Sequence, residues 1–383
     1  MPLAPDLVRR LRRPARTRLA LVAAALGIVA ITAGALVPHG PSAHTKAKPV
    51  DKSIWISLAE LKQLPRSGDA WARLKATADG DLGEADISSR NSVHDAKTLA
   101  AALVFARTGK ESYREKAVEA IMSAIGTEEG GSTLALGRNL VSYVIAADLV
   151  NLRQYSPERN AEFVGWLKTV RKEVLQGKTL ISTQEVRPNN WGTHAGASRA
   201  AVDVYLGNRK DLERAAKVFK GWLGDRSAYQ GFVFSEVDWQ ANPEQPVGVN
   251  PPGATKDGFS IDGALPPEMR RGGQFQFPPE YTDYPWGALA GALVEAQILS
   301  RQGYDAWSWG DQALRRAVQF LYDLDVQYGR WWADGDDAWE PWLVNAVYGT
   351  SFPTEPVLLP GKNMSWTDWT HAAGVGGPPP PPL

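Results

Sequence analysis

The chain has 383 residues, of which 44% are hydrophobic and none is cysteine. This length is sufficient for one large core or two modest ones, and the lack of thiols excludes disulfides, thiolate catalysis, Cys-ligated zinc and iron–sulfur clusters. The net charge is zero, but the first 18 residues hold six arginines against one aspartate, so the remainder is slightly acidic. We therefore expect no nucleic-acid partner.

An uncharged stretch, residues 19–37, directly follows this basic segment. It is long enough to cross roughly 30 Å of hydrocarbon as a helix, and the arginines before it favour an N-terminus on the inner side. A signal peptide usually has a shorter apolar run of roughly 7–15 residues, although Ala33-Gly34-Ala35 offers small residues for cleavage. Residues 1–37 are thus predicted to be a signal peptide or a membrane anchor, with the body outside the cytoplasmic membrane.

Two segments around the body have linker-like composition. Residues 38–54 are rich in Pro, His, Ser, Lys and Gly, and the run 378–382 is all proline. Such compositions are typical of linkers and polyproline tails. We predict a linker over 38–54, one folded domain over 55–371 and a Gly/Pro-rich tail over 372–383.

Apolar residues recur at helical spacing through most of the body. The predicted helices lie around residues 99–106, 113–125, 140–147, 163–174, 212–222, 285–302 and 311–324. Gly109 and Gly126 stand where a helix-ending glycine would. Short connections between successive helices predict an all-α fold, an incomplete α/α barrel or toroid of helical hairpins, with a bundle or solenoid as alternatives.

A long interruption over residues 232–284 is rich in Pro, Gly, Asn, Asp and aromatic residues, as functional loops often are. Twelve of the 15 tryptophans occur from Trp191 onward. An indole can stack on a sugar ring and donate a hydrogen bond, although packing in the core is the usual role of a tryptophan. Trp191, Trp286 and Trp339 are our candidates for contacts with a glycan.

The densest polar motif is Arg187-Pro188-Asn189-Asn190-Trp191-Gly192-Thr193-His194. A helix is predicted to begin near Trp191, with Asn190 as its N-cap. Asn190 and His194 are four residues apart, so both would project from one helix face toward one substrate group. The alternative is a capped helix with a buried, hydrogen-bonded histidine.

Acidic residues cluster in Asp334-Gly335-Asp336-Asp337-Ala338-Trp339-Glu340. Such a cluster can provide the paired carboxylates of a glycoside hydrolase, or it can be a turn in which Asp336 or Asp337 caps the next helix. His94, His194 and His371 show no metal-ligand spacing, and the sequence has neither a phosphate-binding loop nor a Gly-x-Ser-x-Gly motif. We predict no metal and no cofactor.

Four stretches, 64–71, 133–140, 189–194 and 361–369, resemble the alginate lyase family of α/α-toroid polysaccharide lyases, in particular an exported bacterial branch. The resemblance covers about residues 56–371. In the better-characterised members an Asn-Asn pair directly precedes the functional histidine, whereas Trp191-Gly192-Thr193 intervene here before His194.

The resemblance implies metal-independent β-elimination on an anionic, uronate-containing glycan such as alginate. Asn190, His194 and Arg271 would stabilise the charge that develops on the substrate carboxylate, and Tyr284 would transfer protons, with His194 as an alternative base. A guanidinium beside a tyrosine favours the phenolate, which gives the arginine a second use. Substrate-binding candidates on this basis are Asn189, Arg270 and Tyr281, the last two being competitors for the arginine and tyrosine roles.

Two other functions are compatible with these residues. A toroid glycoside hydrolase would use carboxylates from 334–340, facing each other across roughly 5–9.5 Å. A non-catalytic glycan-binding envelope protein would keep the aromatic cleft and lack both constellations.

Overall fold

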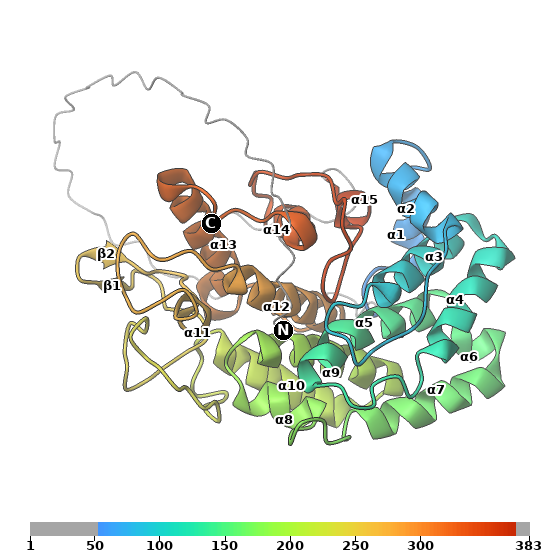
Figure 1. Ribbon diagram of the computed structural model, residues 1–383, viewed down its shortest axis with the longest axis horizontal. Helices are drawn as coiled ribbons and strands as arrows, with labels where there is room; N and C mark the ends of the chain where they lie inside the picture. Colours follow the sequence, from blue (N-terminus) through green and yellow to red (C-terminus); the bar gives the residue numbers. More distant parts are fainter. Residues whose placement is uncertain (1–52, 373–383) are drawn as a thin grey trace, which may run out of the picture. The chain divides into compact units, whose positions relative to one another are not determined.

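The computed structural model describes residues 53–372 (Figure 1). The predicted leader and almost all of the predicted linker and tail lie outside the described residues. None of the helices in 53–372 has the length and apolar character needed to cross a membrane. Ile54, at the end of the predicted linker, is 1% exposed, and its N–H lies 3.2 Å from a carboxylate oxygen of Asp148. The packed body therefore includes a residue that the sequence analysis placed in the linker.

The elements follow one another in chain order as shown by the labels of Figure 1. They are α1 (Leu58–Gln63), α2 (Asp69–Asp79), α3 (His94–Thr108), α4 (Glu111–Ser123), α5 (Thr133–Leu149), α6 (Leu152–Tyr155), α7 (Pro157–Val170), α8 (Leu180–Val186), α9 (Asn190–Leu206), α10 (Arg209–Trp222), β1 (Thr255–Lys256), β2 (Phe259–Ser260), α11 (Pro266–Met269), α12 (Tyr284–Arg301), α13 (Trp309–Tyr328), the 3₁₀ turn η1 (Gly335–Asp337), α14 (Glu340–Tyr348) and α15 (Thr367–Thr370).

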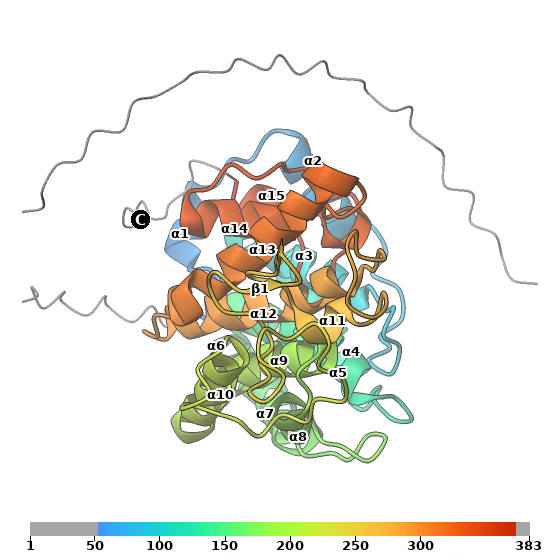
Figure 2. The same ribbon diagram turned by 90° about the vertical axis from the view of Figure 1, so that its left-hand side faces the viewer.

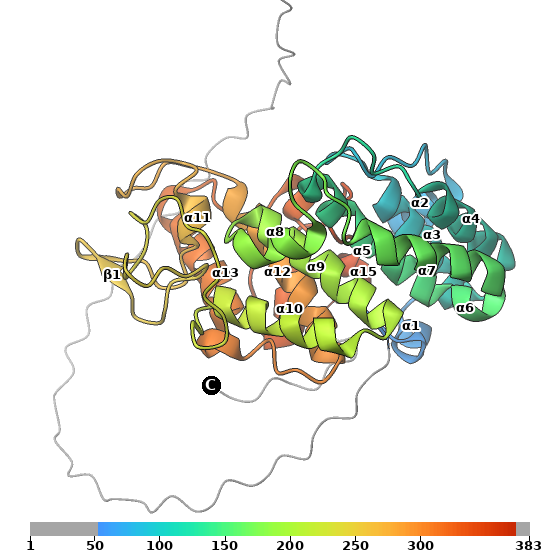
Figure 3. The ribbon, with the colours of Figure 1, turned by 90° about the horizontal axis from the view of Figure 1, so that it is seen from below.

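Long helices form an inner and an outer row (Figures 1 and 3). The inner helices α3, α5, α9 and α12 pack against each other in that order. The outer helices α4, α7, α10 and α13 follow them in sequence, each packed against an inner helix. The all-α prediction is confirmed, and the pairing of inner and outer helices is consistent with an incomplete α/α toroid.

The two rows differ in how their residues are buried. Almost every residue of α5 and α9 is buried, whereas α10 buries one apolar face with Leu212, Phe219 and Trp222. A helix that is buried all round belongs inside a protein, and one with a single apolar stripe belongs at its surface. One predicted boundary was wrong: the helix expected over 163–174 ends at Val170, and Val174 is 66% exposed.

Glycines allow α5 and α12 to approach α9 closely. A Cβ at Gly137 on α5 would lie 2.9 Å from the backbone N of Ala195, and one at Gly291 on α12 would overlap the backbone of Thr193 and His194. Real side chains cannot occupy that space. His194 is consequently held between two helices whose backbones lie almost in contact with its own.

A loop region, residues 223–283, separates α10 from α12 (Figure 2). It contains only α11 and the antiparallel two-residue pair β1–β2, in which Thr255 pairs with Ser260. Trp239 is 1% exposed and lies 4.9 Å, ring centre to ring centre, from Phe275. An aromatic cluster thus orders this region, which leads directly into Tyr284 at the start of α12.

Candidate active site

Asn190 lies in the first turn of α9. The helix begins at Asn190, and Asn189 occupies the cap position without a side-chain cap; the prediction that Asn190 is the N-cap was wrong. The backbone N–H of Asn190 instead donates to the carboxylate of Glu268 on α11. The first N–H groups of a helix have no partner within it, so Glu268 supplies one acceptor from outside.

His194 lies one turn further along α9 and is fully buried. Its Nε2 accepts a hydrogen bond from Nε of Arg138 at 3.2 Å, which requires Nδ1 to carry the proton and to donate to Oδ1 of Asn363. Burial, with the nearby positive charge of Arg138, holds the pKa of His194 well below its usual range. The expectation of a buried, hydrogen-bonded histidine describes this arrangement, and both ring nitrogens are occupied.

Arg138 connects this histidine with the other side of the site. It comes from α5. Burial lowers the pKa of Arg138, and the nearby carboxyl groups of Asp336 and Asp337 and the phenol of Tyr284 oppose that effect. A guanidinium donates through a planar fork of N–H groups that matches a carboxylate. Arg138 is therefore hydrogen-bonded to His194 and lies close enough to Tyr284 to interact with it electrostatically.

Asn363 connects His194 with α5. Its Nδ2 donates to the carbonyl of Gly137 at 2.7 Å, and its backbone N–H donates to the carbonyl of Arg138 at 3.1 Å. The C-terminal segment around Asn363 therefore binds both α5 and the histidine of α9. Neither Arg138 nor Asn363 was chosen from the sequence, although both lie in stretches on which the family resemblance rests.

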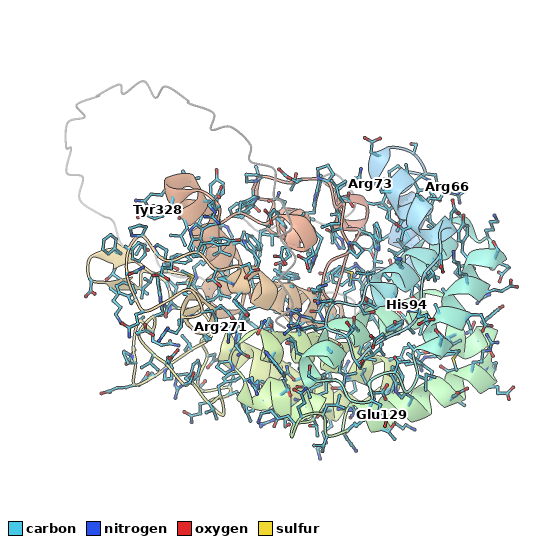
Figure 4. The ribbon with its side chains drawn as sticks, viewed as in Figure 1. Arg66, Arg73, His94, Glu129, Arg271 and Tyr328 are labelled. Atoms are coloured by element: carbon cyan, nitrogen blue, oxygen red, sulfur yellow. The ribbon has the colours of Figure 1, made fainter. Side chains whose placement is uncertain are left out.

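Tyr284 and Arg271 form the exposed part of the site. Tyr284 is 36% exposed, and the guanidinium of Arg271 lies 4.2 Å from its ring centre. Arg271 lies where the loop region meets the central helices (Figure 4). A Cβ at Gly287, one turn after Tyr284, would be 3.9 Å from Nδ2 of Asn190. Asn190, Tyr284 and Arg271 are thus brought to one place.

The two competing candidates are placed differently. Arg270 forms ion pairs with Glu236 at 3.0 Å and with Asp238 at 3.3 Å. Tyr281 is 43% exposed, and its ring packs edge-on against Trp331. Neither contact involves Tyr284 or α9, so Arg271 and Tyr284 are the pair that geometry favours.

A cavity of about 430 Å³ opens beside Arg271. Its charged lining residues are Lys178, Arg187, Arg270, Arg271 and Glu236. Asn189 also lines it, and Nε of Arg187 and Oδ1 of Asn189 are buried without a hydrogen bond within residues 53–372. The volume is in the range of ligand pockets, and four cations against one carboxylate make the cavity suitable for an anion.

The tryptophan candidates are mostly core residues. Trp339 is fully buried, and Trp286 is 4% exposed with its Nε1 donating to the carbonyl of Trp331 at 2.8 Å. A ring enclosed on both faces cannot stack on a sugar, so the expected glycan contacts of these two residues do not fit the structure. Trp191 is half-buried, with the guanidinium of Arg187 4.7 Å from its ring centre.

The acidic cluster lies near Arg138. Asp337 belongs to η1, whereas Glu340 opens α14 and is fully buried. Burial is the main cause that raises the pKa of both carboxyls well above the usual range, and their mutual proximity raises that of Glu340 further. Neither Asp336 nor Asp337 caps α14, contrary to one expectation. Because Glu340 is enclosed, this pair does not face a substrate from two sides as a glycoside hydrolase requires.

No three His, Asp or Glu side chains of the described chain gather as a metal site would need.

The family model described as Alginate lyase matches residues 39–243, more than half of the chain. This span includes Arg138, Asn190 and His194 and ends before Arg271 and Tyr284. No curated protein and no solved structure matched. The family match agrees with the resemblance in the sequence motifs and with the helical fold, and the chain therefore belongs to the alginate lyase family of polysaccharide lyases.

Proposed function

We propose that this polysaccharide lyase cleaves a uronate-containing glycan such as alginate by metal-independent β-elimination. The observation that carries the proposal is the convergence of Asn190, Tyr284 and Arg271, with Arg138 nearby, and the cavity beside Arg271, whose charged lining residues are mostly cations. An anionic polysaccharide fits that charge, and function must be argued from the site rather than from the fold.

The reaction begins at a proton of very low acidity. Removing the C5 proton of a uronate leaves negative charge on the adjacent carboxylate, and donors fixed beforehand around that group lower the barrier. Arg138, Arg271 and the amide of Asn190 can serve as these donors. Arginines can neutralise the carboxylate without a metal ion, which supports the metal-independent course.

Proton transfer is assigned to Tyr284. As phenolate it takes the C5 proton; the C–H electron pair forms the C4–C5 double bond, the C4–O4 bond breaks, and the phenol returns the proton to O4. Both ring nitrogens of His194 are already hydrogen-bonded and the residue is fully buried. His194 therefore acts as a positioning residue for Arg138, and the single-tyrosine course corresponds to syn elimination.

The test is ultraviolet absorbance of unsaturated uronate, measured with polymannuronate, polyguluronate and other uronate glycans. Tyr284→Phe is expected to lower kcat by about 10²–10⁴-fold, the usual contribution of a general acid–base group. Tyr281→Phe decides between the two tyrosines and should keep most of the activity.

Tyr155→Phe is a matched control for this test. Tyr155 has the same exposed fraction, 36%, and carries the guanidinium of Arg114 4.1 Å from its ring centre, but it belongs to α6. Reducing ends without unsaturated product would establish a glycoside hydrolase instead, and binding without either product would establish a glycan-binding protein.

We also propose that the folded body acts outside the cytoplasmic membrane, because a basic segment precedes the apolar stretch 19–37. Cell fractionation of the full chain tests this, together with N-terminal sequencing to determine whether the leader is cleaved or anchors the protein. Recovery of the body in the cytoplasm would contradict it.

A further inference from the structure

Glu268 occupies a position that connects the two parts of the site. It lies on α11 and is 1% exposed. Its side chain accepts the hydrogen bond from the backbone N–H of Asn190, and its backbone carbonyl accepts one from the N–H of Arg271 at 3.0 Å. One residue thus binds both the first turn of α9 and the segment that carries Arg271.

The surroundings of Glu268 indicate that its carboxyl group does more than fill space. Its second carboxylate oxygen is buried without a hydrogen bond among residues 53–372, and the nearby positive charges are those of Arg271 and Arg138. A buried polar atom without a partner is costly, so it is seldom kept for packing alone. An apolar residue would fill the same space at lower cost but would leave the N–H of Asn190 unpaired.

We propose that Glu268 is a positioning residue of the lyase site, fixing Asn190 and Arg271 relative to one another so that both reach one substrate carboxylate. The inference rests on the proposed function, since it assigns that carboxylate as the common target. Small displacements of groups that orient a substrate can cost about 10²-fold in rate.

The experiment compares Glu268→Ala with Glu268→Gln on polymannuronate, with rates expressed per folded protein. The amide oxygen of glutamine can still accept from Asn190, whereas alanine cannot. We expect kcat/KM to fall at least about tenfold in Glu268→Ala, mainly through kcat, and to stay within about threefold of wild type in Glu268→Gln.

Glu295→Gln is the matched control. Glu295 is also 1% exposed, lies on α12 and accepts a hydrogen bond from Nε2 of Gln184 at 2.6 Å, so its replacement perturbs a buried carboxylate elsewhere. Its kcat/KM per folded protein should equal that of wild type. Equal losses in the alanine and glutamine variants, or wild-type activity in Glu268→Ala, would overturn the proposal.

Amide hydrogen exchange separates this inference from the proposed function. Glu268→Ala should increase exchange at residues 190–193, whereas Glu268→Gln and Glu295→Gln should not. If wild type gives no unsaturated product on any uronate glycan, the proposed function fails. Unchanged exchange in Glu268→Ala would show that Glu268 does not hold the first turn of α9, whatever the activity.

Discussion

Helices α5 and α9 and the loop region that leads into α12 contribute different kinds of side chain to the site. From the helices come Asn190, which is 3% exposed, and His194, which is fully buried. From the loop region and the start of α12 come Arg271 and Tyr284, which are exposed. The helical part of the candidate site is therefore buried, whereas the loop part lies at the surface.

The two parts also differ in what holds them. Gly137 and Gly291 bring three helix backbones together around His194, whereas Arg271 is held by a short turn that follows Glu268. Electrostatic interactions in the interior are stronger and less screened by salt than those at the surface. Variants in the two parts should therefore differ in size of effect and in dependence on salt.

Of the two arginines, the one in the helical part is expected to have the larger effect. Arg138→Gln should lower kcat/KM by about 10²–10³-fold, because the loss of one preorganised charge-stabilising donor costs about 2.7–4 kcal/mol. The loss should hardly change between low and high salt. Arg316→Gln, in which a half-buried arginine loses its ion pair with Asp262, should cost stability without lowering kcat/KM per folded protein. Retention of activity by Arg138→Gln would show that the helical part does not bind the reacting carboxylate.

Gly291→Ala tests how closely α12 packs against α9 beside His194. The added methyl group would overlap the backbone of Thr193 and His194, and overpacking of this kind costs typically about 1–3 kcal/mol. We expect a lower free energy of unfolding, measured by urea denaturation. Gly287→Ala on the same helix meets its nearest atom at 3.9 Å and should be neutral or slightly stabilising. Equal stability of the two variants would contradict the packing argument.

The fold was more predictable from the sequence than the site. Helical periodicity identified α3, α5, α10 and α12 because their apolar positions repeat within one segment. The partner of His194 could not be read locally, since Arg138 and Asn363 meet it from positions 56 and 169 residues away. Glu268 was missed because its side chain caps a helix 78 residues earlier in the chain.

The high tryptophan content was the least reliable indication of which residues contact a glycan. Trp286 and Trp339 were chosen because indoles stack on sugars, yet both rings are enclosed in the core. Composition does not distinguish an exposed ring from a buried one. The choice between Arg270 and Arg271 likewise depended on which side chain faces Tyr284, and adjacent positions in an irregular loop give no period from which to infer that.

Arg271→Gln should have a smaller effect than the change at Arg138. Arg271 is exposed, so we expect about a tenfold lower kcat/KM at low salt, equivalent to about 1.4 kcal/mol. Salt screens exposed charges, and the difference from wild type should shrink as ionic strength rises. Initial rates on polymannuronate at two salt concentrations measure this. An effect as large and as salt-independent as that of Arg138→Gln would remove the distinction between the two parts of the site.

The smallest effect concerns the link between the two parts. Burial raises the pKa of Glu268 to about 8, so the folded protein keeps a proton that the unfolded chain releases near pH 4.5. Stability from this group is therefore complete below about pH 4.5 and is lost progressively as pH rises through the folded pKa of about 8, with a slope of at most about 1.4 kcal/mol per pH unit. Glu268→Gln cannot titrate and should flatten the fall in unfolding free energy between pH 7 and 8 by about 1 kcal/mol.

Glu60→Gln should leave that slope unchanged, because the pKa of Glu60 is lowered to about 2 and its carboxylate is ionised throughout this range. Parallel slopes for wild type and Glu268→Gln in urea denaturation would mean that Glu268 is already ionised at pH 7, with its negative charge close to Arg138 and Arg271.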